Sequence, residues 1–350
     1  MRSEDIAKLA GVSRSTVSRV INNYANVPEA TREKVLKVIE QYQYEPNSFA
    51  RALAGKRTET IGLFAISWDE ETDASHIYQN SYFAPFVEAV VETANALGFY
   101  VLIHTVYSKD DFLKVKQAFL QKRIDGGILV GTRKDINVVR ELVELDAPLV
   151  LVDYDISEII AEHLDRSRLS VINSMDYNGT VEAMEYLIQL GHRRIGMLCG
   201  RMNTYSGRER YAAYTDTLVK HGLPIRSEHI LQGDFSKLKA AAAIRNLLAS
   251  GNLPTALFAA NDDMAITAME VLTEYGLSVP QDLSLIGFDD IPVASGIAPK
   301  LSTVKLPIYE MSKAAVEKVI ELCEAEEPAF STRSLPAKLI VRESCGPANM

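Results

Sequence analysis

Several features that mark other classes of protein are missing from this sequence. No window approaches the roughly 20 apolar residues of a membrane-spanning helix, and the opening MRSEDIAKLAG has no apolar stretch long enough for a secretory signal. Cys199, Cys323 and Cys345 are far apart and form no CxxC pair, which argues against a disulfide framework or a zinc site. We therefore expect a cytoplasmic protein with buried or idle thiols and no bound metal.

Catalytic signatures are also absent. The chain contains no G-x-S-x-G elbow, no HExxH and no P-loop, and its six histidines show no ligand spacing. The segment GILVGT lacks the third glycine of a dinucleotide fingerprint. We therefore expect neither an enzyme nor a cofactor. What is present is a chain of 350 residues, 47% hydrophobic and 24% charged, a composition typical of a globular protein with more than one core.

Positive charge is concentrated at one end of an acidic protein. The first 57 residues hold ten Lys and Arg against six Asp and Glu, a net charge of +4, whereas the other 293 residues hold 27 against 40, a net charge of −13. A small basic head on a large acidic body indicates that the head alone approaches a polyanion. Chance clustering of the charges is the alternative.

The first 45 residues read as three short helices. They contain one glycine, Gly11, and one proline, Pro28, and we expect helices over residues 3–10, over residues 13–22 with Ser13 as N-cap, and over residues 29–43. In the second helix Val17, Val20 and Ile21 form one apolar stripe. This stripe would pack the second helix against the first, across a tight turn at Gly11.

The opposite side of the second helix is polar and basic. It carries Arg14, Ser15, Ser18 and Arg19. Arginine can bind guanine O6 and N7 with two hydrogen bonds, and hydroxyl groups bind phosphates, so a helix presented in this way suits the major groove of DNA. An ordinary helical hairpin with a solvated face is the alternative.

After residue 58, apolar strand-like runs alternate with amphipathic helices in two series. The first runs from TIGLFAI to PLVLVD and the second from LSVI to LSLIGFDD. This alternation predicts parallel sheets with helices on both faces, in two lobes. Asp153 and Asp289 end a strand in each series, and ligands of open α/β sheets bind beyond the carboxyl ends of strands. Both residues are therefore expected to line a cleft.

Ordered motifs along nearly the whole chain resemble the LacI/GalR family of bacterial transcription regulators. They are DIAKLAGVSRSTVSRVINN, VPEATREKV, YEPNSFARALAGKRTETIG, LGHRRIG, RERYAAY, PTALFAANDDMA and LSVPQDLSLIGFDDI. The resemblance implies a small all-α helix-turn-helix domain and a two-lobed α/β core like that of periplasmic sugar-binding proteins. We expect a DNA-binding domain over residues 1–46, a hinge over 47–57 and an effector-binding and dimerisation core over 58–350. The N-lobe would take about 58–158 and 291–322, and the C-lobe about 159–290 and 323–345.

The resemblance also assigns DNA-contacting positions. It makes Arg14, Ser15 and Arg19 base-reading residues, with Arg14 and Ser15 selecting the operator. The remaining positions start the recognition helix, contact phosphates or belong to the hinge: Ser13, Thr16, Ser18, Asn22, Asn47, Ala50 and Leu53. Relatives usually begin the first helix with Thr and an aliphatic residue, where this chain has Arg2 and Ser3. Either the N-terminus makes one contact fewer or the true start lies upstream.

The hinge segment NSFARALAG is too short to be a stable helix alone, because isolated helices below ~12–15 residues are marginal. We expect it to fold when paired with its dimer mate on DNA. Leu53 resembles the family leucine that wedges into the minor groove, at a cost of a few kcal/mol of unstacking. A plain linker with an incidental leucine is the alternative.

The family pattern places an effector site in the core. Its expected members are Ser67, Trp68, Asp153, Arg210, Phe235, Asn261 and Asp289. Bidentate polar side chains and an aromatic face suit the hydroxyl groups and apolar face of a sugar. Trp68 could instead be a packed or lid residue, Asp262 and Asp290 could cap helices, and Arg208 could pair with Glu209 or Glu182 on the surface.

These expectations combine into one function. The chain is expected to be a repressor that binds a near-palindromic operator as a homodimer, under allosteric control by a sugar or oligosaccharide. Its partners would be double-stranded operator DNA, the small molecule and a second copy of the chain, with dimer contacts from the helices near Phe83 and in residues 255–275. A purine, a nucleoside or a phosphoprotein co-repressor is the alternative effector, and a sugar-binding protein without a regulatory role is a more distant alternative.

Overall fold

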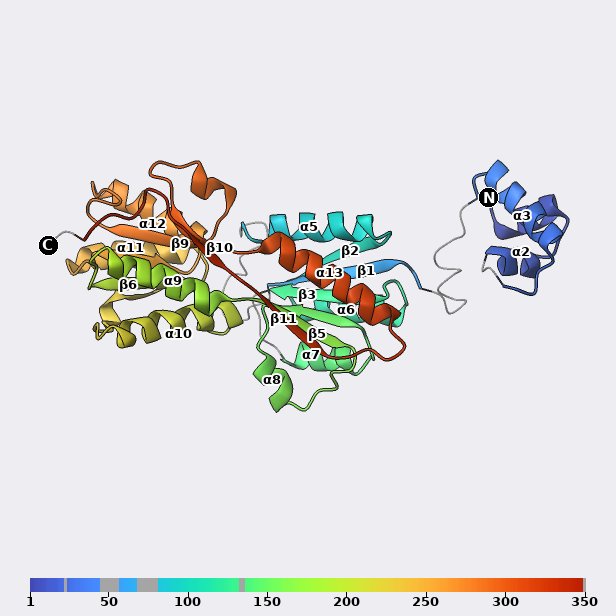
Figure 1. Cartoon of the computed structure of the whole chain (residues 1–350), viewed down its shortest axis with the longest axis horizontal. Coiled ribbons are helices and arrows are strands. Elements are labelled where there is room, and N and C mark those ends of the chain that lie inside the picture. The colour runs from blue at the N-terminus through green and yellow to red at the C-terminus, as the bar shows by residue number, and fades with distance from the viewer. Residues whose placement is uncertain (22–23, 45–56, 68–80, 132–135, 349–350) are drawn as a thin grey trace. The chain divides into compact units, whose positions relative to one another are not determined.

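A computed structural model describes residues 1–21, 24–44, 57–67, 81–131 and 136–348 of the chain. These residues form two compact units, Met1–Thr58 and Glu59–Met350 (Figure 1). In the described ranges, no helix has both the length and the apolar character needed to cross a membrane.

The first unit is a bundle of three helices, α1 (Ser3–Ala10), α2 (Arg14–Ile21) and α3 (Glu29–Gln41). Its core consists of small and branched apolar side chains: Ile6, Ala7, Ala10, Val17, Val20, Val27 and Val35. Gly11 ends α1 with φ 62°, a left-handed conformation that glycine adopts without strain. Ser13 Oγ accepts a hydrogen bond from the amide of Thr16 at 3.2 Å. The predicted turn and N-cap are therefore confirmed, and α3 ends two residues before its predicted end.

The N-lobe of the second unit is built on a six-stranded sheet in which every neighbouring pair is parallel. The strand order is β11 (Ser331–Leu335), β5 (Leu169–Ser174), β4 (Leu149–Val152), β3 (Gly126–Gly131), β1 (Thr60–Ile66) and β2 (Tyr100–Val106). Helices α5 (Phe83–Ala96) and α13 (Ile308–Glu324) contribute to one apolar core. Helices α6 (Lys109–Leu120), α7 (Ile136–Val143) and α8 (Ile156–Ala161) contribute to another. The sheet is therefore covered on both faces (Figure 1).

The C-lobe repeats this design with a second six-stranded sheet. Its order is β12 (Lys338–Ile340), β10 (Ser302–Lys305), β9 (Ser284–Asp289), β8 (Ala256–Ala259), β6 (Ile195–Cys199) and β7 (Ile230–Gln232). Only the pair of β10 and β12 is antiparallel. One apolar core receives side chains from all four long helices, α9 (Asp176–Gln189), α10 (Tyr205–Lys220), α11 (Lys237–Ser250) and α12 (Asp262–Glu274). Two short 3-10 turns, Ser227–His229 and Pro292–Ser295, complete the lobe.

The chain passes between the lobes three times, after β5, after β10 and after β11. The expected lobe limits are wrong at all three passages, because they put β5 and β11 in the C-lobe and β10 in the N-lobe. Parallel pairing places β5 beside β4 and β11 beside β5, whereas β10 pairs with β9. The apolar pattern of a strand reveals that it is buried but not which sheet accepts its hydrogen bonds. The apolar pattern of the sequence does not predict the short strands β7, β10 and β11.

Candidate functional site

Helix α2 separates its apolar residues from its polar ones as its sequence predicts. Val17 and Val20 are buried in the three-helix core, whereas Arg14, Ser15, Ser18 and Arg19 are exposed. Arg14 lies 3.3 Å from Glu4 of α1, and both side chains are more than half exposed. An ion pair of this kind contributes little, about 0–1 kcal/mol, so Arg14 can exchange it for another partner.

Hydroxyl groups gather at the start of α2. Ser13 Oγ lies 2.7 Å from Ser15 Oγ and 2.9 Å from Thr16 Oγ1. These groups and the helix N-terminus together form a surface suited to phosphate oxygens. The DNA contacts of the α2 residues stay a prediction. Asn22, Asn47, Ala50 and Leu53 lie outside the described residues.

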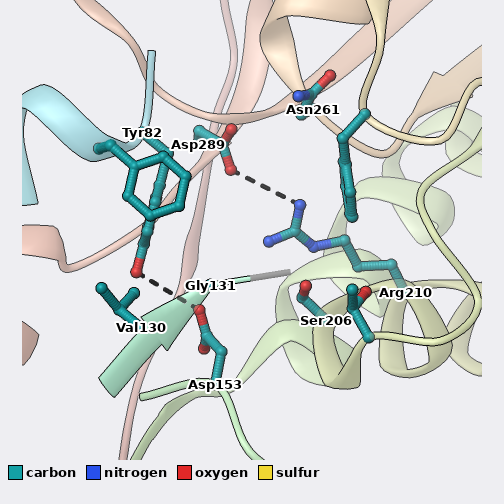
Figure 2. A pocket seen from close by; sticks show the side chains of 11 residues that line it. Tyr82, Val130, Gly131, Asp153, Ser206, Arg210, Asn261 and Asp289 are labelled. Carbon is teal, nitrogen blue, oxygen red and sulfur yellow. Dashed lines mark hydrogen bonds and ion pairs between the residues drawn. The ribbon is translucent and has the colours of Figure 1, made fainter. Parts of the chain in front are cut away.

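A pocket lies between the lobes of the second unit (Figure 2). It includes five of the predicted effector residues, Asp153, Arg210, Phe235, Asn261 and Asp289. The other described lining residues are Tyr82, Phe83, Val130, Gly131, Thr204 and Ser206. Residues from both sheets therefore meet at one site, although Asp153 comes from the N-lobe and the other four predicted residues come from the C-lobe.

The ends of parallel strands bring these side chains together. Asp153 follows β4, Asp289 is the last residue of β9, and Asn261 follows β8 by two residues. The carboxyl ends of parallel strands share one edge of a sheet, so residues distant in sequence converge there. Asn261 also caps α12, because its Oδ1 accepts a hydrogen bond from the amide of Met264 at 2.9 Å.

Several lining residues adopt backbone conformations that side chains disfavour. Asp153 has φ 56°, Phe235 has φ 56° and Asp289 has φ 119°. Gly131 has φ 150°, and a Cβ atom there would lie 1.9 Å from the carbonyl oxygen of Ile66. In residues other than glycine such conformations cost of order 1–3 kcal/mol each, and they tend to cluster at functional sites. Their concentration here supports a binding role for the pocket.

Arg210 organises the centre of the site. Its Nε donates to Asp176 Oδ2 at 2.8 Å and its Nη1 lies 3.6 Å from Asp289 Oδ1, while Nη1 also donates to the carbonyl of Ala260. The guanidinium stacks 3.7 Å from the ring centroid of Phe288. Burial by itself would lower the pKa of Arg210, but the carboxylates of Asp176, Asp289 and Asp153 raise it, so this group stays cationic.

The carboxyl group of Asp153 faces a phenol across the pocket. Tyr82 Oη donates to Asp153 Oδ2 at 3.4 Å (Figure 2), and the Tyr82 ring stacks on Phe86. Burial, reinforced by the nearby charge of Asp176, raises the pKa of Asp153 to about 7. Burial, followed by the charge of Asp153, raises the pKa of Tyr82. At neutral pH the pocket therefore presents both donors and acceptors of hydrogen bonds, beside aromatic rings.

The remaining sequence expectations have varied outcomes. Ser67 is buried after β1, its amide donates to Val106 O at 2.9 Å, and it is not among the described residues that line the pocket. Trp68 lies outside the described residues. Asp262, in the first turn of α12, accepts hydrogen bonds from the amide of Ile291 and from Thr303 Oγ1. Asp290 pairs with Arg342. Both acids therefore have structural partners away from the lining.

The surface pairing considered for Arg208 is wrong. Arg208 on α10 contacts Asp155 and Glu158 of the N-lobe instead of Glu209 or Glu182. The sequence could not indicate this contact, because it depends on how the two lobes meet.

Sequence reasoning missed six lining residues: Tyr82, Phe83, Val130, Gly131, Thr204 and Ser206. A signal existed for three of them. Gly131 ends β3, and Thr204 and Ser206 follow the end of β6, so the strand-end rule that selected Asp153 applies to them as well. Tyr82 precedes α5 and carries no comparable signal. Among the described residues, no group of three or more His, Cys, Asp or Glu side chains could hold a metal ion.

Comparison with known proteins gives both parts of the chain a family. Residues 4–47 match the description "Bacterial regulatory proteins, lacI family", and residues 184–345 match "Periplasmic binding protein-like domain". The chain is 36% identical to the probable HTH-type transcriptional repressor ExuR of Bacillus subtilis, with 97% of both chains covered. It is 31% identical to the HTH-type transcriptional repressor PurR of Haemophilus influenzae, also over 97% of both chains.

Solved structures agree with these matches along the chain. A lac repressor dimer bound to operator and the anti-inducer ONPF is similar with a TM-score of 0.77 and 27% identity, over 98% of both chains. The transcriptional regulator CelR in complex with cellobiose is similar with a TM-score of 0.72 and 29% identity, over 98% of this chain and 99% of that one. This chain therefore belongs to the LacI family of bacterial regulatory proteins, and it is a DNA-binding transcriptional repressor with a ligand-binding domain, not an enzyme.

Proposed function

We propose that this repressor binds a near-palindromic operator as a homodimer, and that a carbohydrate in the pocket between the lobes controls its affinity for DNA. The observation that carries the proposal is the convergence of Asp153 from one lobe with Arg210, Phe235, Asn261 and Asp289 from the other in one pocket. A ligand held by both lobes can couple its own binding to their relative arrangement.

The chemistry of the pocket supports a carbohydrate. Asp153, Asp289 and Asn261 offer oxygen or amide groups to hydroxyls, Thr204 and Ser206 add hydroxyl groups, and Phe235 offers an aromatic face. The similar regulator CelR was solved with cellobiose. The charge of Arg210 is already balanced by Asp176 and Asp289, so the lining suits a ligand with many hydroxyl groups.

The exposed polar side of α2 supports operator binding through this helix. Arg14, Ser15 and Arg19 are exposed on one side of a helix whose other side is buried, and the similar lac repressor was solved as a dimer on its operator. We place base reading on Arg14, Ser15 and Arg19, and phosphate contacts on Ser13, Thr16, Ser18 and Asn22. Asn47, Ala50 and Leu53 would form the hinge contacts, with Leu53 in the minor groove.

Allosteric control follows from differential binding. A carbohydrate that favours one arrangement of the lobes changes the spacing of the two hinges in the dimer, and hence their folding on DNA. Because coupling is reciprocal, operator DNA must change carbohydrate affinity by the same factor.

A screen of the full chain tests the proposal. Thermal unfolding is measured with a panel of mono- and disaccharides, nucleosides and purine bases, because a ligand that binds the folded state alone raises Tm. Hits are then tested for their effect on binding to duplexes selected from a random pool. We expect a carbohydrate to raise Tm and to change DNA affinity, and we expect Asp289→Asn to lose the Tm rise. Indifference to every carbohydrate, with a response to a purine or nucleoside, would contradict the proposed effector class.

A further inference from the structure

An ion-pair cluster outside the pocket joins the two lobes. Arg208 on α10 of the C-lobe lies with Nη2 2.5 Å from Asp155 Oδ2 and with Nη1 3.6 Å from Glu158 Oε1. Asp155 is the N-cap of α8 in the N-lobe, and Glu158 lies in the first turn of that helix. None of the three residues is among those that line the pocket. We propose that Arg208 is a positioning residue that holds the lobes in the arrangement seen here, and so sets the affinity of the pocket for its ligand.

Arg208 faces a surface where acidic side chains of both lobes approach one another. Asp155 and Glu158 come from the N-lobe, while Asp176 and Glu209 come from the C-lobe. Burial, and then the charges of Asp176 and Asp155, raise the pKa of Glu209, and the charge of Arg208 opposes this rise. Burial, and then Asp155, raise the pKa of Glu158. Burial is the larger cause of both shifts, and like charges add to it, because Asp155 acts on Glu209 across the junction and on Glu158 beside it. Removing Arg208 would therefore leave repulsion where there is now attraction.

The ion pairs of Arg208 with Asp155 and Glu158 are exposed enough to break and form again reversibly. The side chains of Arg208, Asp155 and Glu158 are 34%, 24% and 35% exposed. A fully buried pair would be costly to separate, whereas a partly exposed pair can be hydrated again when the lobes part. Such a pair shifts the equilibrium between two arrangements by a moderate factor, which is the range in which a ligand can reverse it.

A second polar contact crosses the junction elsewhere. The amide and hydroxyl of Ser81 donate to Asp263 of α12 at 3.1 and 3.0 Å. In Figure 1, α5 and α12 lie along the upper edge of the two lobes, and α8 and α10 lie along the lower edge. Asp263 also pairs with Lys237 of its own lobe at 2.9 Å, so this second contact holds a charge that is already balanced. Arg208 is therefore the better site for a test, because its partners are both in the opposite lobe.

The test measures the arrangement of the lobes directly in the full chain. Spin labels are attached at Leu113→Cys on α6 and Leu238→Cys on α11, which are exposed positions in different lobes. The three native cysteines are replaced by alanine, so that only the two introduced cysteines carry labels. The labelled chain is mixed with an excess of unlabelled chain, so that few dimers contain two labelled protomers and the measured distances lie within one chain. Pulsed electron paramagnetic resonance spectroscopy then gives the distribution of distances between the labels, in the absence of ligand and DNA.

We expect Arg208→Gln to lower the population at the label distance of the described arrangement, relative to other distances, about threefold, the size expected for a partly exposed ion pair. Added salt should lower the same ratio in the parent chain and have little effect on the variant. Reversing the charges, with Arg208→Glu combined with Asp155→Arg and Glu158→Gln, should restore the population at the label distance of the described arrangement. Lys220→Gln is the matched control, because Lys220 lies on the same helix but pairs with Glu185 of its own lobe.

The proposal is overturned if Arg208→Gln leaves the distances unchanged, or if Lys220→Gln shifts them equally. The claim that the Arg208 ion pairs set the affinity of the pocket for its ligand rests on the proposed function. Because the distances are measured without ligand or DNA, a failure to find a carbohydrate effector would refute the proposed function and leave this result standing. Once an effector is found, its dissociation rate should rise in Arg208→Gln while Lys220→Gln keeps the parental rate.

Discussion

Arg210 Nε donates to Asp176 Oδ2 at 2.8 Å, and both side chains are at most 5% exposed. Asp289 completes the cluster 3.6 Å from the same guanidinium. One cation thus balances carboxyl groups from the start of α9 and the end of β9, at the centre of the pocket.

Replacing Arg210 by Gln should destabilise the core strongly. Asp176 and Asp289 would be left buried without their counter-charge, which typically costs about 3–5 kcal/mol of the free energy of unfolding. Urea unfolding of the full chain, monitored by circular dichroism, gives this loss in the free energy of unfolding. Arg245→Gln is the control, because the ion pair of Arg245 with Glu274 is about half exposed and should contribute no more than about 1 kcal/mol. Similar losses in both variants would contradict the assigned role of Arg210.

The pH dependence of stability should carry the signature of Asp153. Its pKa is raised from 3.8 to about 7, so the folded state binds the proton more tightly than the unfolded state does. The stability associated with this proton is present below about pH 4 and is lost as the pH rises towards about 7. Asp153→Asn resembles the protonated form, so its advantage over the parent should grow across this range, by at most about 1.4 kcal/mol for each pH unit.

Urea unfolding of parent and variant at several pH values checks this sign. Asp165→Asn is the control, because hydrogen bonds from Ser167 lower the pKa of the exposed Asp165, so its titration works in the opposite direction. A difference between Asp153→Asn and the parent that stays constant with pH would show that Asp153 does not titrate in this range.

Changes on the exposed side of α2 should alter the preferred operator without destabilising the core. Exchanging the two residues, with Arg14→Ser and Ser15→Arg, moves a guanidinium by one position on the exposed side of α2. The preferred operator should then change, because each good bidentate contact is worth about 1–3 kcal/mol of discrimination between bases. Selection of duplexes from a random pool reads the preference, and thermal unfolding reads the core.

Lys37→Gln provides the control for this experiment. Lys37 is exposed on α3, and its loss removes a positive charge without changing α2. It should leave the selected sequence unchanged. If the exchange of Arg14 and Ser15 also left it unchanged, the base-reading side of α2 would have to be sought elsewhere.

Gly131 should tolerate no side chain. With φ 150° and a new Cβ atom 1.9 Å from the Ile66 carbonyl, Gly131→Ala would force β1 and β3 apart beside the pocket. We expect a loss of about 3 kcal/mol, at the upper end of the range for overpacking. Gly276→Ala separates the strain of a positive φ from the clash of the new Cβ atom. Gly276 has φ 76°, but no atom lies within 4 Å of its new Cβ. Its loss should be about 1 kcal/mol, and equal losses in urea unfolding would contradict the steric explanation.

Local regularities in the sequence were sufficient for much of the fold. The spacing of Val17 and Val20 predicts the buried side of α2, and the exposure of Arg14 and Arg19 follows from it. Runs of apolar residues predict the long strands, because a parallel strand covered on both faces reads as continuous hydrophobicity. The strand-end rule predicts that Asp153 and Asp289 line a cleft, and both line the pocket.

Other features depend on pairings that no local pattern encodes. The strands β5, β10 and β11 join their sheets through hydrogen bonds to neighbouring strands, and backbone hydrogen bonds look alike in either lobe. Tyr82 reaches Asp153 because tertiary packing brings the residue before α5 within hydrogen-bond distance of the residue after β4.

By itself, the sequence determined the helix-turn-helix, the two α/β series and most of the polar residues of the pocket, because periodicity and strand ends are local properties of the chain. Tertiary structure alone decided which lobe each short strand enters and that Arg208 reaches across the junction to Asp155 and Glu158. The physical reason is that charges act over the few ångströms that separate side chains in space, and that separation is set by how the lobes meet and not by position along the chain.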